Sequence, residues 1–152
     1  MIRFEIDKQF QEQVNETLLK QTTLTALKHL NITESIGLTI LIVGNGEIQA
    51  LNRQYRGVDA PTDVLSFSAG DIDPDTGERY LGDVLISYPK AAIQAQAQGH
   101  PAAAELQLLI IHGVLHLLGH NHATEEEKSL MWGLQSEILA KLDLNIEVER
   151  NE

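Results

Sequence analysis

The chain has 152 residues, a formal net charge of −11 and no cysteine. This length fits a single domain over residues 1–152 with its own core, and the acidity excludes a protein that coats nucleic acid through bulk electrostatics. The lack of cysteine excludes disulfides and thiolate ligands, and the N-terminus has no apolar signal region, so we expect a cytoplasmic protein.

The N-terminal part of the chain predicts a strand, a helix and a second strand. Apolar and charged residues alternate over residues 2–6, which indicates a half-buried strand. From Phe10 to about Leu30, apolar residues recur at the spacing of an amphipathic helix. The β-branched run over residues 36–43 then predicts a buried strand.

The middle of the chain predicts a turn, a short helix and a hairpin. Residues 44–46 have the Gly-Asn-Gly sequence of a turn, and a short helix follows that ends near Arg56. Residues 63–68 and 80–87 have strand character and flank a loop over residues 69–79 that is rich in Asp, Gly and Pro. We therefore predict an antiparallel hairpin with a long tip.

The C-terminal part of the chain predicts three helices. Ser87 starts an alanine-rich helix that ends at Gly99. The apolar run over residues 106–118 is shorter than the ~20 residues of a membrane span, so we expect a buried central helix. A capping box at Thr124 begins the last helix, and we expect the charged tail over residues 147–152 to be frayed.

The order of these elements predicts an α+β fold. We expect a small mixed four-stranded sheet with about five helices packed over it, and a central buried helix that carries an HxxxH pair. The order of the strands within the sheet is not determined by the sequence.

A histidine motif lies at the end of the central helix. His112 and His116 are one helical turn apart on the same face, and Gly119 can end the helix in a left-handed conformation. The chain can then bring His122 to the same point, at the i+10 position of zinc proteases, which fits better than the competing candidate His120. Three neutral imidazoles with one open position predict a catalytic zinc site.

Gly113 is the main departure from the zinc-protease motif. Zinc proteases place a glutamate directly after the first histidine, where it acts as the general base. A site without that glutamate can still bind zinc and acidify water, but it lacks the usual machinery for peptide hydrolysis. The acid, base or charge stabiliser must therefore come from elsewhere in the chain.

Arg56 is followed by a glycine and a polar turn that contains Pro61. An arginine in this position is typical of a solvated helix C-terminus that interacts with the helix dipole. The turn could also hold Arg56 rigidly at the rim of a pocket. There its planar guanidinium would suit a phosphate group.

Three motifs together resemble a known family. The pattern HGxLHLxG…H over residues 112–122, LNxxYRGxDxPTDVLSF over residues 51–67 and LGDVLIS over residues 81–87 are similar to those of the YbeY family. These are bacterial metal-dependent endoribonucleases that act in ribosomal RNA maturation and ribosome quality control. The resemblance covers most of the chain, with the motifs in the same order.

The resemblance implies one zinc ion held by His112, His116 and His122, with Arg56 and His112 important for cleavage of RNA. It implies a single-strand-type endoribonuclease that acts in maturation of the 16S ribosomal RNA 3′ end. We expect ribosomal RNA and small-subunit ribosomal proteins as partners, and we expect neither a membrane nor DNA. Two positions depart from the family pattern, Asn121 for the common Asp and Ser68 for the frequent Pro. If that Asp raises the basicity of a ligand, metal affinity or activity is lower here.

The leading hypothesis is metal-assisted cleavage of an RNA phosphodiester, with Arg56 stabilising the charge that develops on phosphate oxygens. The attacking group is left open between a water on the zinc and the ribose 2′-hydroxyl. Asp83, Asp63 and His120 are candidates for the base. For Asp83 we prefer a role in capping backbone donors at a strand end, and for Asp63 a role in ordering the Pro61 turn.

Two other hypotheses remain. One is a metallohydrolase of another substrate class, such as a peptidase or esterase, which Gly113 counts against. The other is a ribosome-assembly factor whose zinc is structural. A structural zinc would have its fourth position filled by the protein, and chelation would lower the melting temperature sharply.

Overall fold

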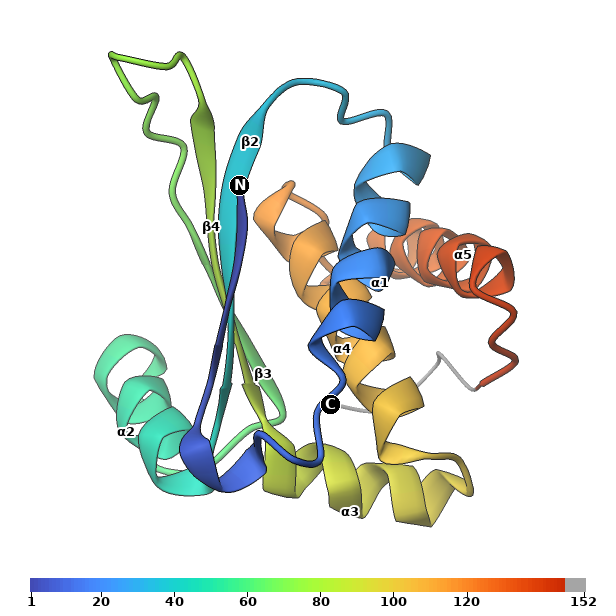
Figure 1. The fold of residues 1–152 in the computed structure, drawn as a ribbon. Coiled ribbons are helices and arrows are strands. Elements are labelled where there is room, and N and C mark those ends of the chain that lie inside the picture. The colour runs from blue at the N-terminus through green and yellow to red at the C-terminus, as the bar shows by residue number, and fades with distance from the viewer. Residues whose placement is uncertain (147–152) are drawn as a thin grey trace.

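The computed structural model describes residues 1–146, and the tail over residues 147–152 for which we expected fraying lies outside them. The described residues form a four-stranded sheet, five α-helices and one short 3-10 helix (Figure 1), which confirms the predicted α+β class. The strands are β1 (Ile2–Ile6), β2 (Ile36–Val43), β3 (Val64–Ser68) and β4 (Arg79–Ser87). The helices are η1 (Lys8–Phe10), α1 (Glu16–His29), α2 (Asn45–Arg56), α3 (Tyr88–Gln98), α4 (Ala102–Leu117) and α5 (Glu125–Lys141).

The sheet is mixed, with strand order β1-β2-β4-β3. β2 lies parallel to both β1 and β4, whereas β3 lies antiparallel to β4. The predicted hairpin is therefore confirmed, and β1 and β3 are the two edge strands. The central strand β2 is buried on both faces, which is why its sequence is an almost unbroken apolar run.

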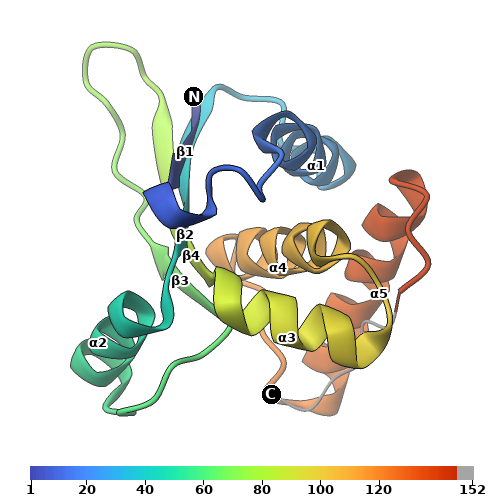
Figure 2. The same cartoon turned by 60° about the horizontal axis from the view of Figure 1, so that its bottom comes forward.

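Helices cover the two faces of the sheet unequally. Figures 1 and 2 show α1 and α4 over one face, with α5 on the far side of α4, and α2 against part of the other face. Thirteen of the sixteen residues of α4 are buried, which confirms the predicted central buried helix. None of the helices within residues 1–146 is long and apolar enough to cross a lipid bilayer.

α4 lies unusually close to the sheet at Gly113. A Cβ atom at this position would come within 2.5 Å of Val84 Cγ1 and 3.2 Å of Ser66 Oγ. The Ser66 hydroxyl also donates a hydrogen bond to the Gly113 carbonyl, at 3.2 Å. The absence of a side chain at Gly113 therefore lets the histidine-bearing end of α4 pack directly on β3 and β4.

Two predicted boundaries are wrong, for local reasons. The helix expected from Phe10 begins only at Glu16, because Asn15 caps its first turn by accepting a hydrogen bond from the Leu18 N–H. Phe10 instead ends η1 and stacks on Tyr88, with ring centroids 5.0 Å apart. The turn expected over residues 44–46 is the first turn of α2.

The predicted caps are confirmed. Ser87 caps α3 through the Lys90 N–H, and Gly99 ends that helix with a φ of 75°. The capping box that begins α5 at Thr124 is complete in both directions.

Candidate metal centre

Three histidines converge where α4 ends. His112 and His116 lie one turn apart on α4, and their Nε2 atoms are 3.1 Å apart. Gly119 has a φ of 95°, so the chain leaves the helix and turns back to bring in His122. One ring nitrogen from each histidine lies within 4.8 Å of the others. The convergence expected from the spacing is confirmed, and this cluster could hold a metal ion.

The orientation of His112 is set by Gln135 of α5. The Nδ1 atom of His112 lies 2.7 Å from Gln135 Oε1, and both side chains are buried. An amide oxygen can only accept, so Nδ1 carries the proton and Nε2 keeps its lone pair for the cluster. The sequence analysis missed Gln135. The available signal was a glutamine at helical spacing from Met131 and Ile138 on the buried face of α5.

Burial favours the neutral form of the two histidines on α4. Burial lowers the pKa of His112, although the bond to Gln135 and the nearby Asp63 carboxylate act in the opposite direction. Burial, with smaller contributions from His112 and His122, lowers the pKa of His116 to about 4. Both imidazoles are therefore neutral near pH 7, which is the form that binds a metal.

The open side of the cluster faces a pocket of about 510 Å³. Besides the three histidines, its lining includes Arg56, Thr62, Asp63, Ser66 and Asn121. Arg56 is the last residue of α2, which ends because Gly57 takes a left-handed φ of 72°. Its side chain is exposed, and within residues 1–146 no carboxylate lies within salt-bridge distance of it. Arg56 thus lies at the rim of a pocket, which was one of the two positions that the sequence left open, and its role there stays a prediction.

Asp63 is a buried carboxylate in the pocket wall, only 7% exposed. Its Oδ1 accepts a hydrogen bond from the Thr62 hydroxyl at 3.3 Å, in keeping with the expected role in this turn. With its amide oriented to donate, Gln94 lies 3.3 Å from Asp63 Oδ2 and 2.9 Å from Glu105 Oε2. Glu105 in turn pairs with His100 at 2.7 Å. A chain of polar side chains, fully buried at Glu105, therefore supports Asp63 from behind, which the sequence analysis did not foresee.

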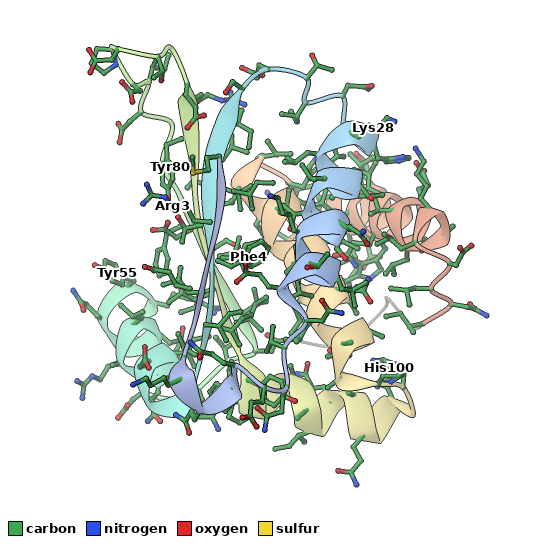
Figure 3. The ribbon with its side chains drawn as sticks, in the orientation of Figure 1. Arg3, Phe4, Lys28, Tyr55, Tyr80 and His100 are labelled. Carbon is green, nitrogen blue, oxygen red and sulfur yellow. The ribbon has the colours of Figure 1, made fainter. Side chains whose placement is uncertain are left out.

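Two other candidates for the base are not in the pocket. Asp83 lies opposite Thr39 in the register and accepts a hydrogen bond from the Tyr80 hydroxyl rather than capping backbone donors. Figure 3 shows Tyr80 on the side of the sheet away from α4. The backbone N–H of His120 donates a hydrogen bond to the Leu115 carbonyl at the end of α4, and His120 does not line the pocket. The candidate role of Asp83 as a base is therefore wrong. His120 lies close enough to influence His116, so its role as an acid or base stays a prediction.

Comparison with known proteins agrees with the geometry. A sequence model of the family described as Endoribonuclease YbeY matches residues 1–143. The chain belongs to the YbeY family. A relative from Carboxydothermus hydrogenoformans named Endoribonuclease YbeY is 47% identical over 132 residues, covering 86% of this chain and 90% of the relative. One of the same name from Geobacillus kaustophilus is 44% identical over 126 residues, covering 75% and 78%.

A solved structure shares the fold. The solution structure of TM1509 from Thermotoga maritima matches with a TM-score of 0.60 and 23% sequence identity, covering 94% of this chain and 92% of that one. At this identity the match concerns the architecture alone. It supports the mixed sheet and the central helix described above.

Two residues of the histidine motif bear on the chemistry of the site, namely Asn121, which departs from the expected family pattern, and Gly113, which departs from that of the zinc proteases. Asn121 lines the pocket, and its Oδ1 accepts a hydrogen bond from the Ala123 N–H at 3.3 Å, so it shapes the turn that carries His122. At Gly113, the position of the zinc-protease glutamate, the contact with Val84 leaves no room for a side chain. Neutral nitrogen donors, a guanidinium and a carboxylate on one open pocket suit metal binding and recognition of phosphate better than peptide hydrolysis.

Proposed function

We propose that this chain is a zinc-dependent endoribonuclease of single-stranded RNA that acts in maturation of the 16S ribosomal RNA 3′ end and in ribosome quality control. The observation that carries the proposal is an open cluster of three imidazoles in a pocket whose rim bears Arg56. Membership of the YbeY family supports RNA as the substrate. We propose that residues 1–152 act as one such domain.

His112, His116 and His122 would hold the zinc ion. Three nitrogen donors with an open side match the ligand set of catalytic zinc, and the bond from His112 to Gln135 matches the outer contacts that orient such ligands. When bound, zinc polarises a phosphate oxygen and lowers the pKa of water. His112 enters catalysis as a ligand, so its contribution depends on the metal.

The chain's own residues supply the remaining roles. The Arg56 guanidinium offers paired donors to two phosphate oxygens and stabilises the negative charge that builds on them during cleavage. Asp63 lies in the same wall with its carboxylate held by Thr62 and Gln94, so it can accept the proton of the attacking hydroxyl. The attacking hydroxyl is that of a water or of the ribose 2′ position.

Ribosomal RNA is the proposed partner, with proteins of the small subunit as further contacts. The net charge of −11 favours basic ribosomal proteins over free nucleic acid as docking surfaces. A ribosomal substrate would place the activity in the cytoplasm.

The test is cleavage of a ribosomal RNA fragment by zinc-loaded protein. We expect Arg56→Ala to lower kcat by about 10²–10³, as for removal of an oxyanion donor, and His116→Ala to abolish cleavage. Arg53→Ala is the matched control, because Arg53 is also exposed on α2 but does not line the pocket. If all variants cut like the wild type, the activity is a contaminant and the proposal fails.

A further inference from the structure

Tyr55, on the last turn of α2, is a large aromatic side chain that is 61% exposed yet held in place. Its ring makes an edge-to-face contact with Phe67 of β3, with ring centroids 5.1 Å apart. Figure 3 shows Tyr55 on the side of the sheet away from α1 and α4. An exposed ring that is fixed by a second ring is already ordered for contact with another flat group.

Both rings are adjacent in sequence to residues of the metal pocket. Arg56, which lines the pocket, follows Tyr55, and Ser66, which also lines it, precedes Phe67. The side chains of successive residues in a strand point to opposite faces, so those of Ser66 and Phe67 lie on the two faces of the edge strand β3. A chain that leaves the pocket over the edge of β3 therefore arrives at Tyr55.

The edge of β3 is polar along this route. The Asp63 carbonyl accepts a hydrogen bond from the Ser87 N–H of β4. Because pairing alternates along antiparallel strands, Val64 and Ser66 direct their backbone N–H and C=O groups toward the open edge instead. Backbone N–H groups of this kind donate to phosphate oxygens in nucleic-acid complexes.

Charge alone would bind RNA weakly here. The chain carries a net charge of −11, and among the described pocket-lining residues Arg56 has the one permanent positive charge. Few phosphates can therefore be neutralised, so the salt-dependent share of the affinity is small. Stacking of a base on an aromatic ring does not depend on net charge, and its loss weakens binding about ten-fold.

We propose that Tyr55 is a base-stacking subsite, where an unpaired base next to the cleaved phosphodiester rests on the exposed ring while the phosphate lies at Arg56. The inference rests on the proposed endoribonuclease function and deepens it. A paired base stays stacked within its duplex, so the subsite selects single-stranded RNA. Tyr55 is thereby assigned a specificity role that Arg56 alone cannot fill.

The test uses zinc-loaded protein and a single-stranded RNA that contains 2-aminopurine, whose fluorescence falls when it stacks on an aromatic ring. Tyr55→Leu keeps an apolar contact with Phe67 but removes the ring, and we expect it to lose the quenching and to raise Kd and KM about ten-fold, with a smaller effect on kcat. Tyr55→Phe should restore the quenching. Leu130→Ala, at an apolar position of similar exposure on α5, is the matched control and should behave like the wild type.

The outcomes separate the two proposals. If the wild type cleaves RNA and Tyr55→Leu matches it in quenching and KM, the stacking subsite is wrong and the endoribonuclease function stands. If the wild type binds and quenches but never cleaves, the function is wrong and the subsite stands. Equal affinity for the same RNA as a duplex would overturn the subsite. So would a loss, in Tyr55→Leu, of binding to a ribosomal protein with RNA binding unchanged.

Discussion

The Nδ1 atom of His112 and the Oε1 atom of Gln135 lie 2.7 Å apart, and this contact ties α5 to α4 directly behind the histidine cluster. Metal-binding histidines commonly donate their second ring N–H to a carboxylate or a carbonyl, which fixes the ring and raises its basicity. A neutral amide supplies the orientation with less gain in basicity than a carboxylate would give. The affinity of the histidine cluster for zinc should therefore depend on which residue stands at position 135.

We expect Gln135→Leu to weaken zinc binding by about ten-fold, because His112 loses the acceptor that fixes its tautomer. Gln135→Glu should strengthen binding. The measurement is competition with a chromophoric chelator. Gln107→Leu is the matched control, since Gln107 is also buried and bonds α4 to another helix, at Thr22 of α1, away from the cluster. An equal loss of affinity in Gln107→Leu would show that general loosening of α4 is the cause.

Two histidine–glutamate pairs have the same distance between nitrogen and oxygen but differ in burial, so they test how burial changes the contribution of such a pair to stability. His100 and Glu105 lie 2.7 Å apart and are almost wholly buried, whereas His29 and Glu137 lie 2.7 Å apart with the glutamate largely exposed. We expect His100→Ala to lower the free energy of unfolding by roughly 2 kcal/mol or more, since a buried carboxylate loses a partner. His29→Ala should cost under about 1 kcal/mol. Urea unfolding of both variants measures the free energy of unfolding, and equal losses in the two variants would contradict the expected effect of burial.

The lowered pKa of His116 gives the metal-free protein a defined pH dependence. The folded imidazole has a pKa of about 4 against an ordinary value of 6.5, so between these values the unfolded chain binds a proton that the folded protein does not. The free energy of unfolding should therefore be fully retained above pH 6.5 and fall as the pH drops toward 4. Urea unfolding of His116→Gln across this window should show a shallower slope than that of the wild type, and an identical slope would refute the assignment.

Gly113 and Val84 should be energetically coupled. A methyl group at position 113 would meet the stiff Val84 side chain at 2.5 Å, and overpacking of this kind costs about 1–3 kcal/mol. The better helix propensity of alanine offsets up to about 1 kcal/mol of this. We expect Gly113→Ala to destabilise the protein, and Gly113→Ala with Val84→Ala to lose less than the sum of the single changes. Chemical denaturation measures these losses. If the loss in the double variant equals the sum of the two single losses, α4 has moved away from the sheet and the added methyl group does not contact Val84.

The sequence predicted the element types well, because their signals are local. Alternation identified β1, the spacing of two histidines placed them on one helix face, and the capping box at Thr124 located the start of α5. The predicted start of α1 was wrong, because the apolar spacing continues back to Phe10. Spacing alone cannot show that a residue is apolar for contact with a distant part of the chain and not with its own helix. Phe10 is apolar because it packs on Tyr88, far along the chain.

The site was predicted in part, and its gaps share one cause. The histidine cluster follows from spacing within one short segment, whereas Asp83 and Asp63 could be told apart only by knowing which face and edge of the sheet α4 covers. Gln135 is polar in a helix whose neighbouring residues are apolar, and sequence periodicity cannot show which partner a buried amide meets. Strand order and the close approach at Gly113 depend on the same tertiary information.

All three cluster histidines come from residues 112–122, and this compactness affects how metal binding and folding are linked. A segment this short can gather its imidazoles around a zinc ion even when the rest of the chain is unfolded. Stabilisation by a ligand reflects the difference between its affinities for the folded and unfolded chains. Zinc should therefore raise the melting temperature by less than its affinity for the native protein implies. What folding adds at the ligands is the contact from Gln135 of α5 and the burial that keeps His112 and His116 neutral.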